Sequence, residues 1–368
     1  MDTASLAPIF RSTGPFATAL IDVSHDSENA EQEHELRVRA ACDALREQGA
    51  DDAVVSAVEE RLSQSVSRAA PVSRFVVAAA DGVLYDDVAG VRTDQPVAHW
   101  GQLPDLSKWI EHQDSVFAFV LALVDHEGGD VAVYDSDVPE PEQESSVGGE
   151  TQHVHKVPVG GWSALRYQHV TENVWAQNAA DVADRINAHI DEGHDLVLLA
   201  GDPQSVPLVR EKINDTGVTI VELETGTRAE DGGDEALQQA IREALFAQAL
   251  ERRLALSHEL KDRLGRDYAV ATGVRDVADA FVRGQVETLL LDPGAADDLT
   301  LDVSQHPGLV VGADNPQGEV PAGPALVAAA VLTSAGVAVT RSAAMGGSPV
   351  TALLRWDQAA EGSDARGE

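Results

Sequence analysis

Residues 151–171 read TQHVHKVPVGGWSALRYQHVT, and this stretch differs in character from the rest of the chain. It contains no acidic residue, although the chain has 62 Asp and Glu residues among 368. Its polar and basic side chains and its Gly-Gly pair predict an exposed loop. Residues 320–356 are also free of acids, but they are rich in Ala and Val and are expected to be buried.

The side chains of residues 151–171 are suited to binding RNA. Basic and imidazole groups supply phosphate contacts, and an aromatic ring offers a face on which a base can stack, worth about 1–3 kcal/mol. We therefore predict a set of rRNA-binding residues in this loop: His153, His155, Lys156, Gly160, Gly161, Trp162, Arg166, Tyr167 and His169.

Two other interpretations of this loop stay open. In the first, it is an ordinary surface loop whose Trp162 folds back into the core. In the second, His153 and His155 bind a metal ion together with His169, although the stretch offers no carboxylate to complete the ligand shell.

Composition restricts the classes of function. The formal net charge of −36 repels nucleic acid over most of the surface, so an RNA site must be a local exception. The single cysteine, Cys42, excludes an internal disulfide and a multi-Cys zinc site. With no signal peptide and no apolar run of about 18 residues, we expect a cytoplasmic protein that does not contact membranes. The acidity fits either a salty cytoplasm or a high-GC genome.

Hydropathy patterns predict an α/β protein of three domains, at 1–113, 114–228 and 229–368. The acidic residues 140–150 are expected to form an exposed loop, and the Gly-rich residues 226–234 mark a boundary. Helices are expected at 28–48, 52–66, 170–190, 235–264, 274–283 and 324–333. Strands are expected at 16–21, 75–78, 83–85, 116–124, 130–134, 196–200, 218–223, 288–291, 308–311, 336–340 and 350–354.

The common catalytic motifs are missing from the sequence. None of the four lysines follows the glycines of a Walker A motif, and neither a GxGxxG helix opening nor a GxSxG elbow is present. The pair His258-Glu259 lacks the second histidine of an HExxH zinc site. We therefore predict no catalytic residue, no cofactor and no metal.

Residues 160–167 (GGWSALRY) resemble the middle domain of the archaeal and eukaryotic class-1 release factor and Pelota superfamily. In that superfamily, Gly-Gly-Gln precedes Ser-Ala-Leu-Arg-Phe and a long helix. Residues 198–201 (LLAG) stand where the next strand of the family ends. Residues 14–17 (GPFA), the pair His155-Lys156 and the GGW run resemble a bacterial branch found in actinobacteria, which is similar to the ribosome-hibernation factor Balon.

This resemblance implies both a fold and a function. The fold is a divergent α/β N-terminal domain, an RNase-H-like middle domain and a C-terminal α/β/α sandwich. The function is hibernation or stress response through binding to the vacant ribosomal A site, with the GGW loop directed toward the peptidyl-transferase centre. Elongation factor Tu is the delivery partner that the resemblance suggests.

Trp162 occupies the position of the glutamine that helps water attack peptidyl-tRNA in release factors. An indole has one N–H donor and no acceptor, so we expect no peptide release. One alternative is a peptidyl-tRNA hydrolase of ribosome rescue in which Gln168 substitutes for that glutamine. Another is a stress-linked α/β protein that binds a partner other than the ribosome.

An RNase-H-like fold also raises the question of a metal nuclease. Asp125, Glu127 and Asp130 cluster after the first long strand of the middle domain. The simpler interpretation is that all three are turn residues.

Overall fold

The computed structural model describes residues 3–26, 29–66, 70–114, 116–125, 128–135, 141–147, 175–224, 233–316 and 318–357. The chain forms two compact units. Unit 1 comprises residues 1–115 and 253–368, and unit 2 comprises residues 116–252. Each unit combines sheets with helices, which confirms the predicted α/β class. No helix in the described part of the chain has the length and apolar character needed to cross a membrane.

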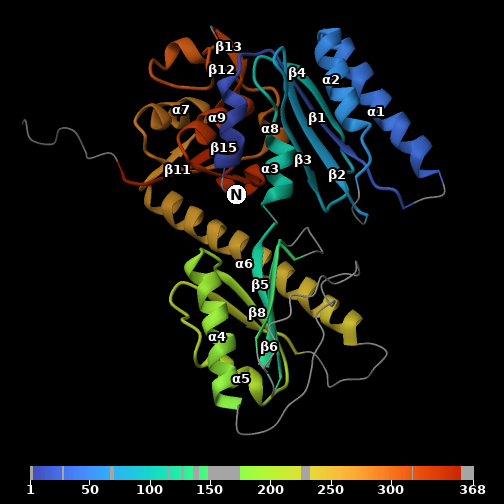
Figure 1. Ribbon diagram of the computed structural model, residues 1–368. Helices are drawn as coiled ribbons and strands as arrows, with labels where there is room; N and C mark the ends of the chain where they lie inside the picture. Colours follow the sequence, from blue (N-terminus) through green and yellow to red (C-terminus); the bar gives the residue numbers. More distant parts are fainter. Residues whose placement is uncertain are drawn as a thin grey trace, which may run out of the picture. The chain divides into compact units, whose positions relative to one another are not determined.

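The N-terminal part of unit 1 is a four-stranded antiparallel sheet that carries two helices on one face (Figure 1). Alternation along β1 decides which face each side chain occupies. Ala19 and Ile21 pack beneath the helices, whereas Leu20 points to the opposite face. The sheet order is β3-β2-β1-β4, built from β1 (Phe16–Asp22), β2 (Ser73–Ala79), β3 (Gly82–Ala89) and β4 (Val97–Gly101), and the helices are α1 (Ala30–Glu47) and α2 (Asp52–Leu62).

The C-terminal part of unit 1 is a mixed sheet of order β10-β15-β11-β14. Its strands are β10 (Val270–Thr272), β11 (Val286–Leu291), β14 (Gly336–Val339) and β15 (Val350–Leu354). The helices of unit 1 that accompany it are α3 (Ser107–Gln113), α7 (Val274–Val282), α8 (Pro293–Ala296) and α9 (Ala322–Leu332). The remaining elements are the pair β12 (Thr300–Asp302) and β13 (Glu319–Pro321) and the 3-10 segments η1 (Ala4–Arg11), η2 (Val303–Gln305) and η3 (Ser342–Met345).

One hydrophobic core joins the two sheets of unit 1. Leu20 of β1, Trp109 of α3 and Leu326 of α9 belong to the same buried cluster. Trp109 is fully buried and stacks on Phe75 of β2, with ring centroids 4.9 Å apart. The expected N-terminal and C-terminal domains therefore share a core, which the sequence pattern did not show. The division into three domains stays a prediction.

Unit 2 is built on a five-stranded sheet of order β7-β6-β5-β8-β9. β6 is antiparallel to both of its neighbours, whereas β5, β8 and β9 run parallel. The RNase-H-like assignment of this region stays a prediction. The strands are β5 (Ala118–Asp125), β6 (Gly128–Asp135), β7 (Gln143–Val147), β8 (Leu196–Gly201) and β9 (Thr219–Glu222).

Helices cover both faces of this sheet. Val120 and Ala122 of β5 pack with α4 (Trp175–Asp191) and α5 (Ser205–Arg210). The alternate residue Leu121 packs with Ile241, on the first part of α6 (Gly233–Arg266). Because both faces are covered, β5 and β8 read as nearly continuous apolar runs.

Two sequence predictions were wrong in detail. Residues 308–311 form no strand, although Leu309 and Val311 are buried and Val310 is exposed. The side chain of Asn315 accepts a hydrogen bond from the Val311 N–H (3.0 Å) and donates one to the Leu309 carbonyl (2.7 Å), taking the place of a strand partner. In the acidic segment 140–150, Gln143–Val147 form strand β7 at the sheet edge.

Gly201 allows β8 to pass close to the end of β5. Its φ is +130°, and a Cβ atom there would lie 1.9 Å from the Val124 carbonyl oxygen.

Gly201→Ala is expected to lower the free energy of unfolding by about 2–5 kcal/mol, because strand separation and backbone conformation must both change. Gly217→Ala is the matched control, since its φ is +77° with no atom within 4 Å. Gly217→Ala should lower the free energy of unfolding by only about 1–2 kcal/mol. Urea unfolding measures both, and equal losses would contradict this account.

Candidate functional site

All of the predicted rRNA-binding residues lie outside the described part of the chain. They are His153, His155, Lys156, Gly160, Gly161, Trp162, Arg166, Tyr167 and His169. The structure describes the two elements that flank residues 148–174 in the sequence.

The flanking elements are edge strand β7, which ends at Val147, and helix α4, which begins at Trp175. A polar chain links the two elements. The Arg185 Nε on α4 donates to Ser145 Oγ on β7 at 2.9 Å, and this hydroxyl donates to the Val131 carbonyl on β6 at 3.3 Å. The two elements that flank residues 148–174 in the sequence are thus bonded to one another.

The entry into α4 is compatible with an anionic ligand. The first turn of α4 contains no acidic residue, in a chain of charge −36. The first N–H groups of a helix lack intrahelical acceptors and lie at the positive end of its dipole. A phosphate near the start of α4 would therefore meet no carboxylate from the first turn of the helix.

Asp130 is a buried carboxyl on the same sheet. It lies on β6, is 7% exposed, and stands opposite Ser146 of β7. Burial raises the pKa of Asp130, a hydrogen bond with the Ser146 side chain lowers it, and the nearby Asp125 carboxylate raises it. The balance is a pKa above the ordinary value, which favours the neutral acid more than in an exposed aspartate.

The turn and nuclease interpretations of the acidic cluster can now be compared for two of its three members. Asp125 and Asp130 are both strand residues, on β5 and β6, rather than turn residues. Glu127 lies outside the described residues. Within the part of the chain that the structure describes, neither aspartate belongs to a group of three potential metal ligands. The geometry therefore gives no support to a nuclease centre here.

The raised pKa of Asp130 makes a prediction about stability. A folded-state pKa above the unfolded value means that the ionised carboxylate destabilises the fold, and that this cost disappears as pH falls through the folded pKa. Asp130→Asn should therefore be more stable than the unmodified chain at pH 7, and the gain should shrink as pH is lowered.

Urea unfolding as a function of pH measures this gain. Asp184→Asn removes the same charge from an exposed position on α4 and serves as the control. If Asp130→Asn gains no more than this control at pH 7, the assignment of a destabilising buried carboxylate is wrong.

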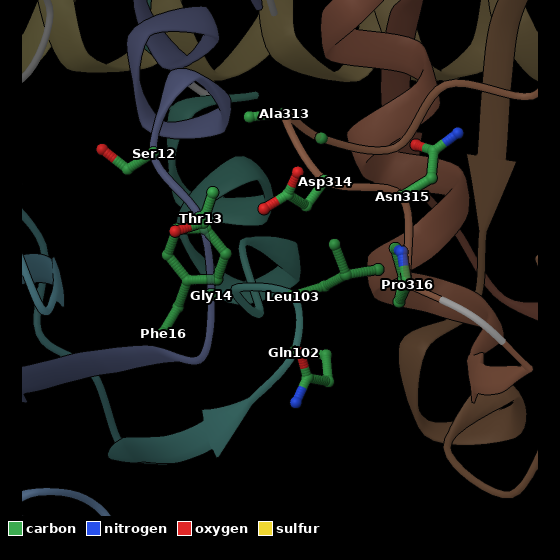
Figure 2. Close-up of a pocket in the computed structure, with 11 residues that line it drawn as sticks. Ser12, Thr13, Gly14, Phe16, Gln102, Leu103, Ala313, Asp314, Asn315 and Pro316 are labelled. Atoms are coloured by element: carbon green, nitrogen blue, oxygen red, sulfur yellow. The ribbon is translucent and has the colours of Figure 1, made fainter.

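A pocket in unit 1 is a further feature to consider. Its volume is about 160 Å³. Figure 2 shows the segment of Ser12, Thr13 and Gly14 on one side and the loop that carries Asp314 and Asn315 on the other. Asp314 supplies its charge, and no lysine, arginine or histidine lines it. The pocket is unsuited to a phosphate, so it adds nothing to an RNA interface. It is lined by Ser12, Thr13, Gly14, Phe16, Gln102, Leu103, Gly312, Ala313, Asp314, Asn315 and Pro316.

A known family covers the sheet and helices of unit 2. Residues 118–266 match the model of bacterial archaeo-eukaryotic release factor family 2. Over this span, which is less than half of the chain, the sequence is similar to the bacterial archaeo-eukaryotic release factors. The release-factor-like segment runs from β5 to the end of α6 and includes residues 151–171, so the sequence resemblance drawn from GGWSALRY is confirmed.

Individual relatives are more distant. The chain is 25% identical over 286 residues to the uncharacterized protein Rv2629 of Mycobacterium tuberculosis, covering 76% of this chain and 75% of that protein. A ribosome-bound archaeal Pelota with ABCE1 has a TM-score of 0.40 at 14% identity, covering 96% of this chain and 94% of that one. Dom34 of S. cerevisiae has a TM-score of 0.40 at 10% identity, covering 97% and 93%. These solved structures are too dissimilar to place a site.

Proposed function

We propose that this protein is a ribosome-associated hibernation or stress factor that binds the vacant ribosomal A site. The observation that carries the proposal is the run GGWSALRY, which lies within the release-factor-like segment 118–266. In the superfamily, the corresponding loop is directed toward the peptidyl-transferase centre. We assign the same orientation to residues 160–162 of this chain.

The side chains of the loop supply the contacts to rRNA. Lys156 and Arg166 neutralise phosphates, the three histidines donate or accept hydrogen bonds, and the rings of Trp162 and Tyr167 stack on bases. The absence of acids between residues 151 and 171 keeps this surface from repelling RNA. Salt in the cell weakens repulsion between the rest of the protein and the ribosome, since screening acts most strongly on exposed charges.

The chemistry of Trp162 argues against peptide release by this loop. To promote hydrolysis, a group at the tip must hold a water molecule beside the ester and accept or donate hydrogen bonds to it. The indole offers one donor and no acceptor, and it is much larger than an amide. The proposed role is therefore occupancy of the A site in the cytoplasm, with elongation factor Tu as the proposed delivery partner.

The rRNA contacts predict how substitutions change ribosome binding. Trp162→Ala should weaken binding by about tenfold or more, since stacking on one base contributes about 1–3 kcal/mol. Lys156→Ala should also weaken binding and reduce its dependence on salt. Lys212→Ala removes the same charge from an exposed position outside the loop and should leave binding unchanged.

Co-sedimentation of the full chain with vacant ribosomes over a range of salt concentrations measures these effects. Circular dichroism of each variant establishes that it is folded. Folded Trp162 and Lys156 variants that bind as well as the unmodified chain would exclude this loop as the binding site.

Peptide release distinguishes a binding factor from an enzyme. The chain is added to ribosomes that carry labelled peptidyl-tRNA, and the amount of released peptide is measured over time. We expect no release above the buffer control, from the unmodified chain or from Gln168→Ala. Release that disappears in Gln168→Ala would instead identify a peptidyl-tRNA hydrolase in which Gln168 acts in place of the missing glutamine.

A further inference from the structure

Helix α4 ends in a Schellman motif that reverses the chain. The N–H of His194 donates to the His189 carbonyl at 3.1 Å, and the N–H of Gly193 donates to the Ile190 carbonyl at 2.9 Å. Gly193 has a φ of +108°, which the motif requires at this position and which glycine adopts without strain. The reversal places the side chain of His194 over the last turn of the helix that it has just left.

This reversal brings together three potential metal ligands. The His189 Nδ1 lies 2.9 Å from a carboxylate oxygen of Glu192. The rings of His189 and His194 have centroids 6.0 Å apart, at an interplanar angle of 69°. One ligand atom from each of His189, Glu192 and His194 lies within 4.8 Å of the other two. Among the described residues, this is the one group of three that meets this criterion.

Histidine is an unusual residue at the first and last positions of a Schellman motif. Its first and last positions commonly carry side chains that make a hydrophobic contact. Here both are histidines, and His189 is 1% exposed. Its Nε2 is buried without a hydrogen-bond partner among the described residues. The nitrogen that faces Glu192 is Nδ1, so the buried ring turns one of its two possible ligand atoms toward the carboxylate.

Charge and exposure favour a cation at this place. The C-terminal end of a helix carries the negative end of its dipole, and Glu192 adds a full negative charge. Glu192 is exposed and His194 is half-buried, so an ion can reach the group from solvent. Two imidazoles and one carboxylate suit Zn²⁺ and similar divalent transition metals, and three protein ligands leave a coordination position for water.

We propose that His189, Glu192 and His194 form a binding site for a divalent transition metal ion of the Zn²⁺ class. The ion ties the end of α4 to the residue that leads into β8. This site shares no residue with 151–171 and does not depend on the proposed role at the ribosome. In the sequence, it corresponds to the spacing His-x-x-Glu-x-His at 189–194, which only the chain reversal at Gly193 converts into a cluster.

The test is metal binding by the full chain after treatment with a chelator. Calorimetric titration with Zn²⁺ should show one site with micromolar or tighter affinity, and Co²⁺ should give the visible absorption bands of a low-symmetry nitrogen and oxygen site. Zn²⁺ in excess should raise Tm by about 5 °C, because it binds the folded state preferentially.

Two variants remove one ligand each from positions that are not deeply buried. His194→Ala and Glu192→Gln should each weaken Zn²⁺ binding by at least about tenfold and abolish the rise in Tm. His153→Ala combined with His155→Ala is the control for the other histidine pair and should leave the affinity unchanged. Unchanged binding in both ligand variants, loss of binding in the control, or no binding of Zn²⁺ at micromolar concentration would each overturn the proposal.

Discussion

The parallel pairing of β5 with β8 is the interaction on which unit 2 depends. These strands lie at the centre of the sheet and are buried on both faces, under α4 and α5 on one side and the first part of α6 on the other. Such pairing fixes which side chains face which helix, because a slip of one residue would exchange the two faces. The packing of α4 against one face of the sheet follows from this register.

Much of the fold could be predicted from hydropathy because both faces of the central strands are apolar and the helices are amphipathic. The runs at 116–124 and 196–200 predicted β5 and β8 to within two residues at each end, and the spacing of apolar residues predicted α4 and α6. Edge strand β7 was missed because its residues are polar and its stability comes from main-chain pairing with β6. The shared core of unit 1 was missed because Trp109 and Leu326 are far apart in sequence.

The functional features likewise fall into those that the sequence indicates and those that only the structure shows. The GGW run stands out in the sequence because its residue types differ strongly from the rest of an acidic chain, and it lies within the span of the family match; its role in binding stays a prediction. The neighbourhood of Asp130 and the cluster of His189, Glu192 and His194 could not be found. The neighbourhood of Asp130 depends on burial between paired strands. The cluster of His189, Glu192 and His194 depends on a positive φ at Gly193. Neither burial nor chain reversal is visible in residue spacing.

We propose, as the central point, that residues 148–174, which lie between β7 and α4 in the sequence, contact ribosomal RNA. Cryo-electron microscopy of vacant ribosomes incubated with the full chain tests it most directly. We predict density for the chain in the A site, with residues 160–162 at the peptidyl-transferase centre and α4 leading away from it. A bound chain whose residues 148–174 lie away from rRNA, or ribosomes without the chain, would contradict the claim.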